Sequence, residues 1–304
     1  IPLIQSLEIE SLMLEDPYED YEKPHFIIQE DSIKKYTESV RKLMEGHIYH
    51  ENDKSLKIFE VIANDIVKEI NSSTAEAILD MKERNSNLYE HTVMVTLLSV
   101  LVGKKLKLDE QRLYNLALGC LLHDIGLRYV TIPYEGRDLT AVEPAEMFEY
   151  KKHTILGYSA LQDETWIPQI SRKMILSHHE NMEGTGFPMK QKYKETECRI
   201  IQACDAFDCY ISGMECKRMS VQEALDIMIG NAGKKYDKAV VDNLVSTVAK
   251  YPVGTTVKTN VEERGVVISQ TVDPENPIIM ILNTDECSER NLMLEENISI
   301  LGVV

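Results

Sequence analysis

The chain has 304 residues, 43% of them hydrophobic and 27% charged, which is typical of a globular protein with one large core or two domains. Its formal net charge of −17 argues against a nucleic acid polymer or an anionic membrane surface as a partner, because the long-range field has the wrong sign. The longest apolar stretch, residues 93–102, is too short to span a bilayer. Six cysteines without a CxxC pair predict free thiols in a reducing compartment, so we expect a cytoplasmic protein with no membrane span.

The first predicted elements are helices. Residues 1 to about 30 are acidic and rich in turn formers, and no fold is assigned to them. From Asp31 onward, apolar residues recur every three or four positions over residues 31–43 and 56–70, which predicts two helices. A third helix is predicted from Thr74 to Arg84, with Ser72-Ser73 as its cap.

The helical pattern continues to about residue 250 and then changes to a period of two. Short β-branched runs separated by turns follow, which predicts a small β module. The chain is therefore expected to be mainly α, with an N-terminal segment (1–72), for which a regulatory role is one interpretation, a helical domain (73–252) and a β module (253–304). Further predicted helices cover 91–103, 109–122, 146–161, 167–177, 195–210, 220–229 and 237–250, and predicted strands cover 255–257, 265–268, 278–282 and 298–304.

Five of the eight histidines lie within the helical domain and, with two aspartates, form one spaced set. Imidazole and carboxylate groups are ligands for divalent metals. A single buried histidine is more often a satisfied core residue, but here each candidate lies at the end or on the face of a different predicted helix. Such an arrangement directs ligands into the interior of a bundle. The set is His91, His123, Asp124, His153, His178, His179 and Asp205.

Two features of this set point to a pair of ions. Adjacent ligands, as in His123-Asp124 and His178-His179, are compatible with one site only where a helix ends, because neighbours inside a helix diverge by about 100°. Seven ligands also exceed what one ion needs, so a bridging carboxylate between two ions is expected. A pair of ions suits hydrolysis at phosphorus, since one carries the nucleophilic hydroxide while both polarise the phosphate.

Three motifs resemble one known family. Residues 121–126 (LLHDIG) resemble the His-Asp signature of the HD-domain phosphohydrolases. Residues 178–188 (HHENMEGTGFP) are similar to the HHExxDGxGYP stretch of the HD-GYP subgroup, and residues 199–208 (RIIQACDAFD) to its aspartate-bearing helix. The resemblance covers about residues 74–250 and implies an HD-domain bundle around a di-metal site, so that 73–252 is identified as an HD-GYP domain.

The resemblance also implies roles for the ligands. One ion is held by His91, His123, Asp124 and Asp205, and the second by His153, His178 and His179, with Asp124 as the bridging, catalytic carboxylate. Family members carry iron, or manganese as the alternative, and hydrolyse the second messenger cyclic di-GMP. Some bind a third ion through a glutamate that is Asn87 here, so two ions are predicted.

The sequence departs from the family at substrate contacts. Leu127 replaces a lysine, Phe187 the tyrosine of GYP, and Met214 an arginine, whereas Lys190 and Lys217 match family phosphate-contact positions. Each lost charge-assisted contact costs about 1.5–3 kcal/mol. If positions 127 and 214 face the phosphates, restoring lysine and arginine there raises turnover.

Three functions are compatible with this pattern. The leading interpretation is a metal-dependent phosphodiesterase that hydrolyses cyclic di-GMP through a metal-bridging hydroxide, with weak activity because its substrate contacts are depleted. The first alternative is a catalytically degenerate receptor that binds a cyclic dinucleotide or a signalling protein partner. The second is a phosphohydrolase that acts on another phosphoester.

Overall fold

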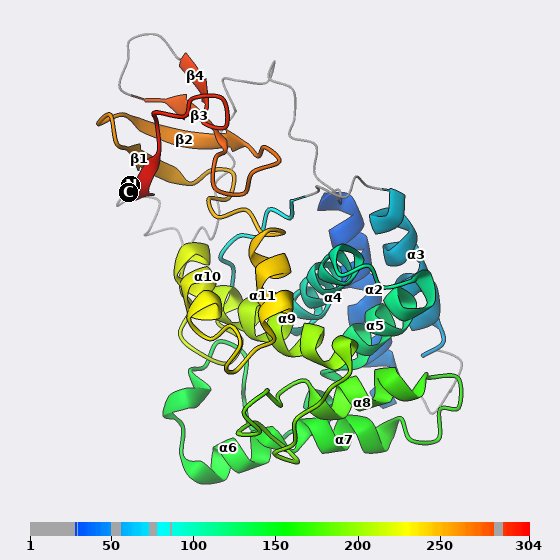
Figure 1. Ribbon diagram of the computed structural model, residues 1–304. Helices are drawn as coiled ribbons and strands as arrows, with labels where there is room; N and C mark the ends of the chain where they lie inside the picture. The colour runs from blue at the N-terminus through cyan, green and yellow to red at the C-terminus, as the bar shows by residue number, and fades with distance from the viewer. Residues whose placement is uncertain (1–27, 29, 50–55, 73–77, 86, 283–287) are drawn as a thin grey trace.

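The computed structural model describes residue 28 and residues 30–49, 56–72, 78–85, 87–282 and 288–304 (Figure 1). The described chain is mainly helical and ends in a five-stranded antiparallel sheet, as predicted. The helices are α2 (Glu30–Tyr49), α3 (Ile58–Ser72), α4 (Leu88–Lys105), α5 (Glu110–Leu122), α6 (Pro144–Lys151), α7 (His153–Ala160), α8 (Gln169–Ser177), α9 (Thr196–Ser212), α10 (Val221–Gly230) and α11 (Lys238–Val245), with short 3-10 turns at Ile125–Tyr129 and Leu139–Ala141.

Helix α4 lies at the centre of the bundle. Its residues are buried almost all the way round, which explains why its sequence is continuously apolar rather than amphipathic. Side chains fix where the central helices begin: Asn87 accepts hydrogen bonds from the backbone of Tyr89 and Glu90 at the start of α4, and Asp109 accepts one from Arg112 at the start of α5. Helices α5 and α9 pack against α4. Of the predicted ligands, His91 lies on α4 and Asp205 on α9, and His123 and Asp124 directly follow α5.

Helices α2 and α3 pack on the same core. Val40 and Phe59, both fully buried, belong to one continuous hydrophobic cluster with Leu98 of α4 and Leu116 of α5. The described part of the predicted N-terminal segment therefore shares its core with the helical domain. The predicted boundary at residue 72 stays a prediction.

The predicted helix at 74–84 is wrong for its described part, because residues 78–85 contain no helix. Leu79 forms a β-bridge with Val248, its N–H donating to the carbonyl of Thr247 at 2.7 Å and its carbonyl accepting from Ala249 at 3.1 Å. These long-range hydrogen bonds override the local helix propensity. Residues 73–77, including most of the proposed start of the helix, lie outside the described residues.

The C-terminal strands are β1 (Thr256–Thr259), β2 (Arg264–Ser269), β3 (Ile278–Ile281), β4 (Ser288–Asn291) and β5 (Ile300–Val303), in the order β4-β3-β2-β1-β5. Val257, Val267 and Ile279 form the sheet's own small core with Tyr251. Strand β4 escaped the sequence analysis because its sequence, SERN, lacks β-branched residues. The sheet lies beyond α10 and α11, at the opposite end of the molecule from α6 and α7 (Figure 1).

Two predictions about chain chemistry are tested within the described residues. Cys120, Cys198, Cys204, Cys209 and Cys216 are free thiols, as expected. Cys287 lies outside the described residues. None of the helices described is both long and apolar enough to cross a bilayer.

Candidate metal centre

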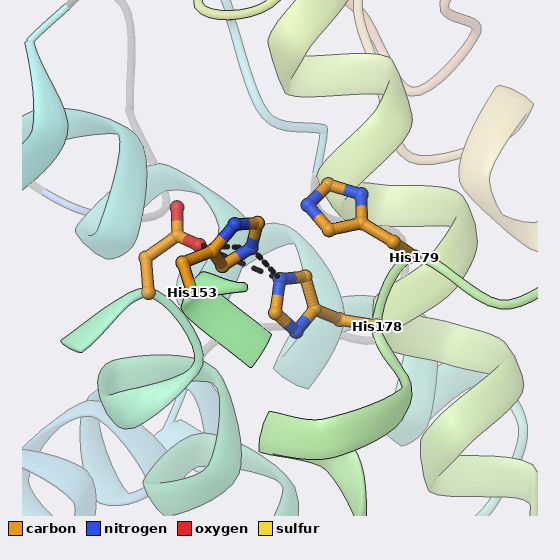
Figure 2. A group of neighbouring side chains, drawn as sticks. His153, His178 and His179 are labelled. Carbon is orange, nitrogen blue, oxygen red and sulfur yellow. Dashed lines mark hydrogen bonds and ion pairs between the residues drawn. The ribbon is translucent and has the colours of Figure 1, made fainter. Parts of the chain in front are cut away.

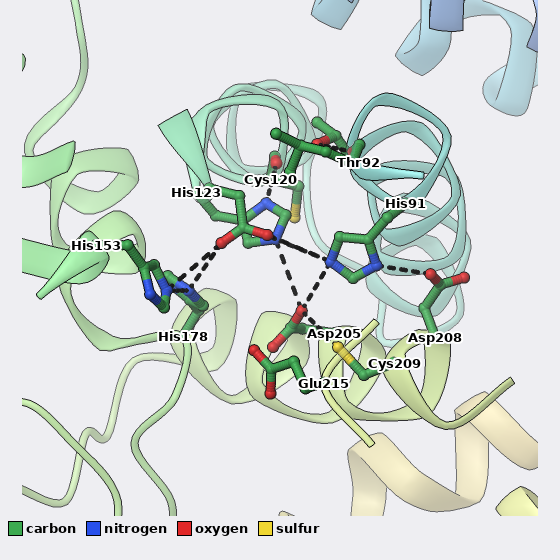
Figure 3. Close-up of polar contacts among 12 residues, drawn as sticks. His91, Thr92, Cys120, His123, His153, His178, Asp205, Asp208, Cys209 and Glu215 are labelled. Atoms are coloured by element: carbon green, nitrogen blue, oxygen red, sulfur yellow. Dashed lines mark hydrogen bonds and ion pairs between the residues drawn. The ribbon is translucent and has the colours of Figure 1, made fainter. Parts of the chain in front are cut away.

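The structure brings all seven predicted ligands together in the interior of the bundle (Figures 2 and 3). Most of them stand at the ends of helices, as the adjacent pairs require. His123 is the residue that caps the end of α5, with Asp124 next in the chain, and His178 caps the end of α8, with His179 next. His153 opens α7, whereas His91 and Asp205 project from α4 and α9. Among the seven, only His179 has a side chain as much as 10% exposed.

The ligands form two groups that meet at one carboxylate. Oδ2 of Asp124 lies 3.5 Å from Nε2 of His91 and 3.2 Å from Nε2 of His123. Its other oxygen, Oδ1, lies 3.5 Å from Nε2 of His153 and 3.4 Å from Nε2 of His178. The two oxygens of Asp124 thus face different groups, which is the geometry of a bridging ligand. The groups are His91, His123 and Asp205, and Asp124, His153, His178 and His179 (Figures 2 and 3).

Hydrogen bonds on the far side of the rings direct the lone pairs into the site. Nδ1 of His123, His153 and His178 donates to the backbone carbonyls three residues earlier, at 2.6, 2.8 and 2.9 Å. With the proton on Nδ1, each Nε2 carries a free lone pair. Nε2 of His123 lies 3.3 Å from Nε2 of His91, and the corresponding atoms of His153 and His178 are 3.1 Å apart.

These residues fit a pair of divalent cations. Oδ1 of Asp124 is buried and accepts no hydrogen bond within the described part of the chain. A buried carboxylate oxygen facing imidazole lone pairs is costly unless a positive charge compensates it. Histidine and carboxylate donors suit zinc, iron or manganese, and the donor set alone does not select among them.

The electrostatics of the two groups differ. Burial alone lowers the pKa of His91, but hydrogen bonds to Asp205 and Asp208 outweigh it and raise that pKa to about 9. Burial, together with the charge of neighbouring His179, lowers the pKa of His153 to about 3. His91 therefore lies in a field that attracts cations, whereas His153 keeps the neutral form that binds metal.

A second carboxylate that the sequence analysis missed supports His91. Oδ2 of Asp208 accepts from Nδ1 of His91 at 2.7 Å, and both Asp208 oxygens accept from Nη2 of Arg84 at 2.6 and 2.7 Å. Asp208 is fully buried. It lies three residues after Asp205 on α9, and that spacing places both carboxylates on one face of the helix. This spacing was the available signal, whereas nothing local pointed to Arg84.

Glu215 is the other carboxylate that was missed. Its Oε1 lies 3.1 Å from Nε2 of His179, and the hydroxyl of Tyr150 donates to the same carboxylate. Glu215 follows Met214 in the turn after α9, so it stands next to the position where the family has an arginine. Sequence reasoning focused on the missing cation and gave no weight to the added anion.

A cavity of about 350 Å³ opens onto His178, His179 and Asp205, and Phe187 and Glu215 also line it. The Phe187 ring stacks on His179, with centroids 4.5 Å apart and an interplanar angle of 22°. Gly186 permits this approach, because a Cβ there would lie 2.3 Å from the carbonyl oxygen of His179. The GTGFP stretch thus forms one wall of the cavity beside the ligands.

The predicted substrate contacts lie elsewhere. Lys190 and Lys217 are exposed, and neither lines this cavity. Leu127 and Met214 are each 1% exposed and belong to the hydrophobic core, so neither side chain faces the cavity. The assignment of Lys190 and Lys217 to substrate binding stays a prediction.

Asn87, which stands where some relatives have a third-ion ligand, has another role here. Its Oδ1 accepts from the backbone N–H groups of Tyr89 and Glu90, at 3.1 and 3.0 Å, and so caps α4. An amide engaged in this way is a poor replacement for a carboxylate ligand. The prediction of two ions rather than three is consistent with this arrangement.

Comparisons with known proteins agree with the motifs. The chain is 28% identical over 217 residues to the cyclic di-GMP phosphodiesterase PA4108 of Pseudomonas aeruginosa, covering 68% of this chain and 52% of that protein. It is 26% identical over 199 residues to the cyclic di-GMP phosphodiesterase PdeB of Borreliella burgdorferi. That alignment covers 64% of this chain and 51% of PdeB. The chain thus spans about half the length of these curated relatives.

The fold is shared with Bd1817, an HDG"Y"P protein from Bdellovibrio bacteriovorus, with a TM-score of 0.60 and 23% identity over 70% of this chain and 69% of that one. The sequence model of the HD domain family matches residues 67–240. This match spans α4 to α9 and so includes every predicted ligand. The chain therefore belongs to the HD domain family and is a distant relative of HD-GYP cyclic di-GMP phosphodiesterases.

Proposed function

We propose that the chain is a metal-dependent phosphodiesterase that hydrolyses cyclic di-GMP with low activity. The observation that carries this proposal is the position of Asp124, whose two oxygens face two separate groups of ligands. The relatives named above supply the substrate class, since both are cyclic di-GMP phosphodiesterases. The acidic chain as a whole repels phosphates, so a cationic centre is needed to attract one.

His91, His123 and Asp205 would hold one ion and His153, His178 and His179 the second, with Asp124 shared by both. When bound, two divalent ions lower the pKa of a water molecule and polarise the phosphate. We propose iron for this pair, with manganese as the alternative. Asp124 is the catalytic residue in the sense that it fixes the spacing of the two groups, and no side-chain nucleophile is required.

The protein's own residues shape the rest of the site. Phe187, stacked on His179, excludes water from one side of the ligands. Asp208 keeps the proton of His91 on Nδ1, so Nε2 stays available as a ligand. Low activity follows from the loss of two cations, because the buried, uncharged Leu127 and Met214 stand where the family has a lysine and an arginine.

The test is turnover of cyclic di-GMP by anaerobically purified protein whose metal content is measured on the same sample. We expect close to two metal equivalents and slow hydrolysis that disappears in Asp124→Ala. Turnover of a simple phosphoester but not of cyclic di-GMP would show that the substrate is another phosphoester. Two equivalents of metal with no hydrolysis of either compound would overturn the enzymatic proposal.

Glu215 favours a receptor as the second candidate. Its carboxylate lies beside His179 in the cavity, next to the position where the family has an arginine. An anion here opposes the charge that develops on a phosphate during hydrolysis. A receptor would bind a cyclic dinucleotide without cleaving it and pass the signal to a protein partner, with the N-terminal segment (1–72) as the regulatory part. Nucleotide binding without turnover, in fully metal-loaded protein, would support this candidate.

A further inference from the structure

We propose that Lys235 binds a non-bridging phosphate oxygen of the dinucleotide in the metal cavity. This inference rests on the proposed function and assigns its missing phosphate contact to a residue outside the recognised motifs. Lys235 lies in the turn between α10 and α11, more than 25 residues after the last metal ligand, and lines the same cavity as His179 and Asp205.

The backbone of Lys235 is fixed to the wall of the cavity. Its N–H donates to the carbonyl of Asn231 at 3.0 Å, and its own carbonyl accepts from Met182 at 3.0 Å. Met182 belongs to the stretch after His178-His179, so these bonds join the α10–α11 turn to the loop that carries Phe187. The Lys235 Nζ lies 5.4 Å from the centroid of the buried Tyr236 ring. Lys235 is half-buried, and Tyr236, over whose ring its ammonium group lies, lines the same cavity.

The charge balance of the cavity makes this lysine the best candidate. Among the described residues that line the cavity, Lys235 is the only lysine or arginine, whereas Glu180, Asp205 and Glu215 bring carboxylates. No carboxylate in the described ranges lies within 4.0 Å of its Nζ, so the ammonium is not neutralised by an ion pair. Every internucleotide phosphate carries a negative charge and needs such a partner to approach these carboxylates.

The alternatives for this contact are weaker. Leu127 and Met214 have no charge and are buried. Lys190 and Lys217 are exposed outside the cavity, and Lys217 lines a separate hollow with Asp138. Lys151 places its Nζ 5.1 Å from the centroid of Phe187 but does not line the cavity. Among the described residues, Lys235 is therefore the lysine that lines the cavity of the proposed metal pair.

The test compares Lys235→Met with Lys234→Met in the full, metal-loaded chain. Methionine keeps an unbranched side chain and removes the ammonium charge together with its contact over the Tyr236 ring. Lys234 is the matched control, because it is the adjacent lysine, is exposed, and reaches the carbonyl of Gly230 at 3.4 Å instead of the cavity. The measurements are metal content, melting temperature, KM and kcat for cyclic di-GMP, and Kd for its phosphorothioate analogue.

We expect Lys235→Met to raise KM and Kd about tenfold or more, which corresponds to the loss of one charge-assisted hydrogen bond. Metal content and melting temperature stay at the wild-type level, and kcat changes less than KM because the contact exists before and during the reaction. The differences in KM and Kd between Lys235→Met and wild type also become smaller at high salt, because salt screens a charge contact near the surface. Lys234→Met leaves all of these values unchanged.

Wild-type KM and Kd in Lys235→Met would overturn this inference while leaving the proposed function intact. An equal loss in Lys234→Met would also overturn it, because the effect would then come from the general charge of the turn. If the metal-loaded wild type neither binds the analogue nor hydrolyses cyclic di-GMP, the proposed function fails and this inference fails with it.

Discussion

Asp208 holds His91 from the side opposite Asp124 and Asp205, with its Oδ2 2.7 Å from Nδ1 of the ring (Figure 3). The same carboxylate accepts two hydrogen bonds from Arg84, which comes from the non-helical residues 78–85 before α4. A chain of charges therefore runs from that segment to Nε2 of His91, which faces Asp205 at 3.2 Å. These contacts connect Arg84, before α4, to His91 and Asp205 of the first ligand group.

We predict that Asp208→Asn weakens binding of the first ion about 10–100-fold, which is typical for the loss of a partner that orients a metal-bound histidine. The amide still accepts from Nδ1 of His91, so the change tests the charge rather than the hydrogen bond alone. Metal affinity is measured by competition with a chromogenic chelator. Asp242→Asn is the control, since that carboxylate is 56% exposed and pairs only with Lys238. Equal affinities in wild type and Asp208→Asn would show that the charge of Asp208 has no role at the site.

Asp124→Ala is expected to remove both ions, because its two oxygens face the two groups of ligands. Asp205→Ala removes a ligand from the first group only, so it should retain about one metal equivalent. Elemental analysis measures the metal content of the two variants. Far-UV circular dichroism checks that both remain helical. Two tightly bound ions in Asp124→Ala would rule out the bridge.

The clustering of the seven candidate ligands was predictable because its signal is local. Adjacent ligands such as His123-Asp124 need a helix end, and the apolar periodicity that precedes each pair shows where the helix ends. The β module was also predictable from a local signal, because the spacing of apolar residues changes from helical to alternating after about residue 250. Each of these features depends on residues that are neighbours in the sequence, and the structure confirms the corresponding helices and strands.

The remaining features depend on contacts between distant segments. Residues 78–85 have an acceptable helical pattern, but pairing of Leu79 with Val248 decides their conformation. Glu215 and Lys235 enter the cavity through turns after α9 and α10, and no motif marks either residue. Leu127 looked like a lost cation beside the metals because only its sequence position was visible. Its burial depends on how the 3-10 turn after Asp124 packs against α7.

We therefore expect Leu127→Lys and Met214→Arg to destabilise the fold rather than restore turnover. Both side chains are 1% exposed in the hydrophobic core, and burying an unpaired charge there costs about 3 kcal/mol or more. Denaturant unfolding measures this loss. Thr185→Lys is the control, because Thr185 lines the cavity but is exposed, so a lysine there should change the unfolding free energy far less. Wild-type stability together with faster turnover in Leu127→Lys would show that position 127 does face the substrate.

Removing the metals should lower the stability of the chain. An ion present at a hundred times its Kd stabilises the folded state by about 2.7 kcal/mol, and a chelator removes that contribution. For a chain of this size we expect the melting temperature to fall by about 5–10 °C and to recover when Mn²⁺ or Fe²⁺ is returned. Differential scanning calorimetry makes the measurement. Asp124→Ala should melt at the same temperature with and without chelator, and a chelator effect that persists in this variant would place the responsible ion elsewhere.

The last prediction concerns the attachment of α3 to the helix that ends at His123-Asp124. The Tyr114 hydroxyl on α5 donates to Oε1 of Glu60 on α3 at 3.1 Å. Burial, followed by the charge of Glu60 and this hydrogen bond, raises the pKa of Tyr114 to about 12. The folded-state pKa of Tyr114 lies above the unfolded value of about 10 for tyrosine. Its contribution to stability is therefore fully present below about pH 10 and is lost as the pH rises through 12.

The difference in unfolding free energy between wild type and Tyr114→Phe should therefore shrink from pH 9 to pH 12, as measured by urea denaturation. A difference that stays constant over this range would mean that the Tyr114–Glu60 contact does not couple α3 to the metal-binding core.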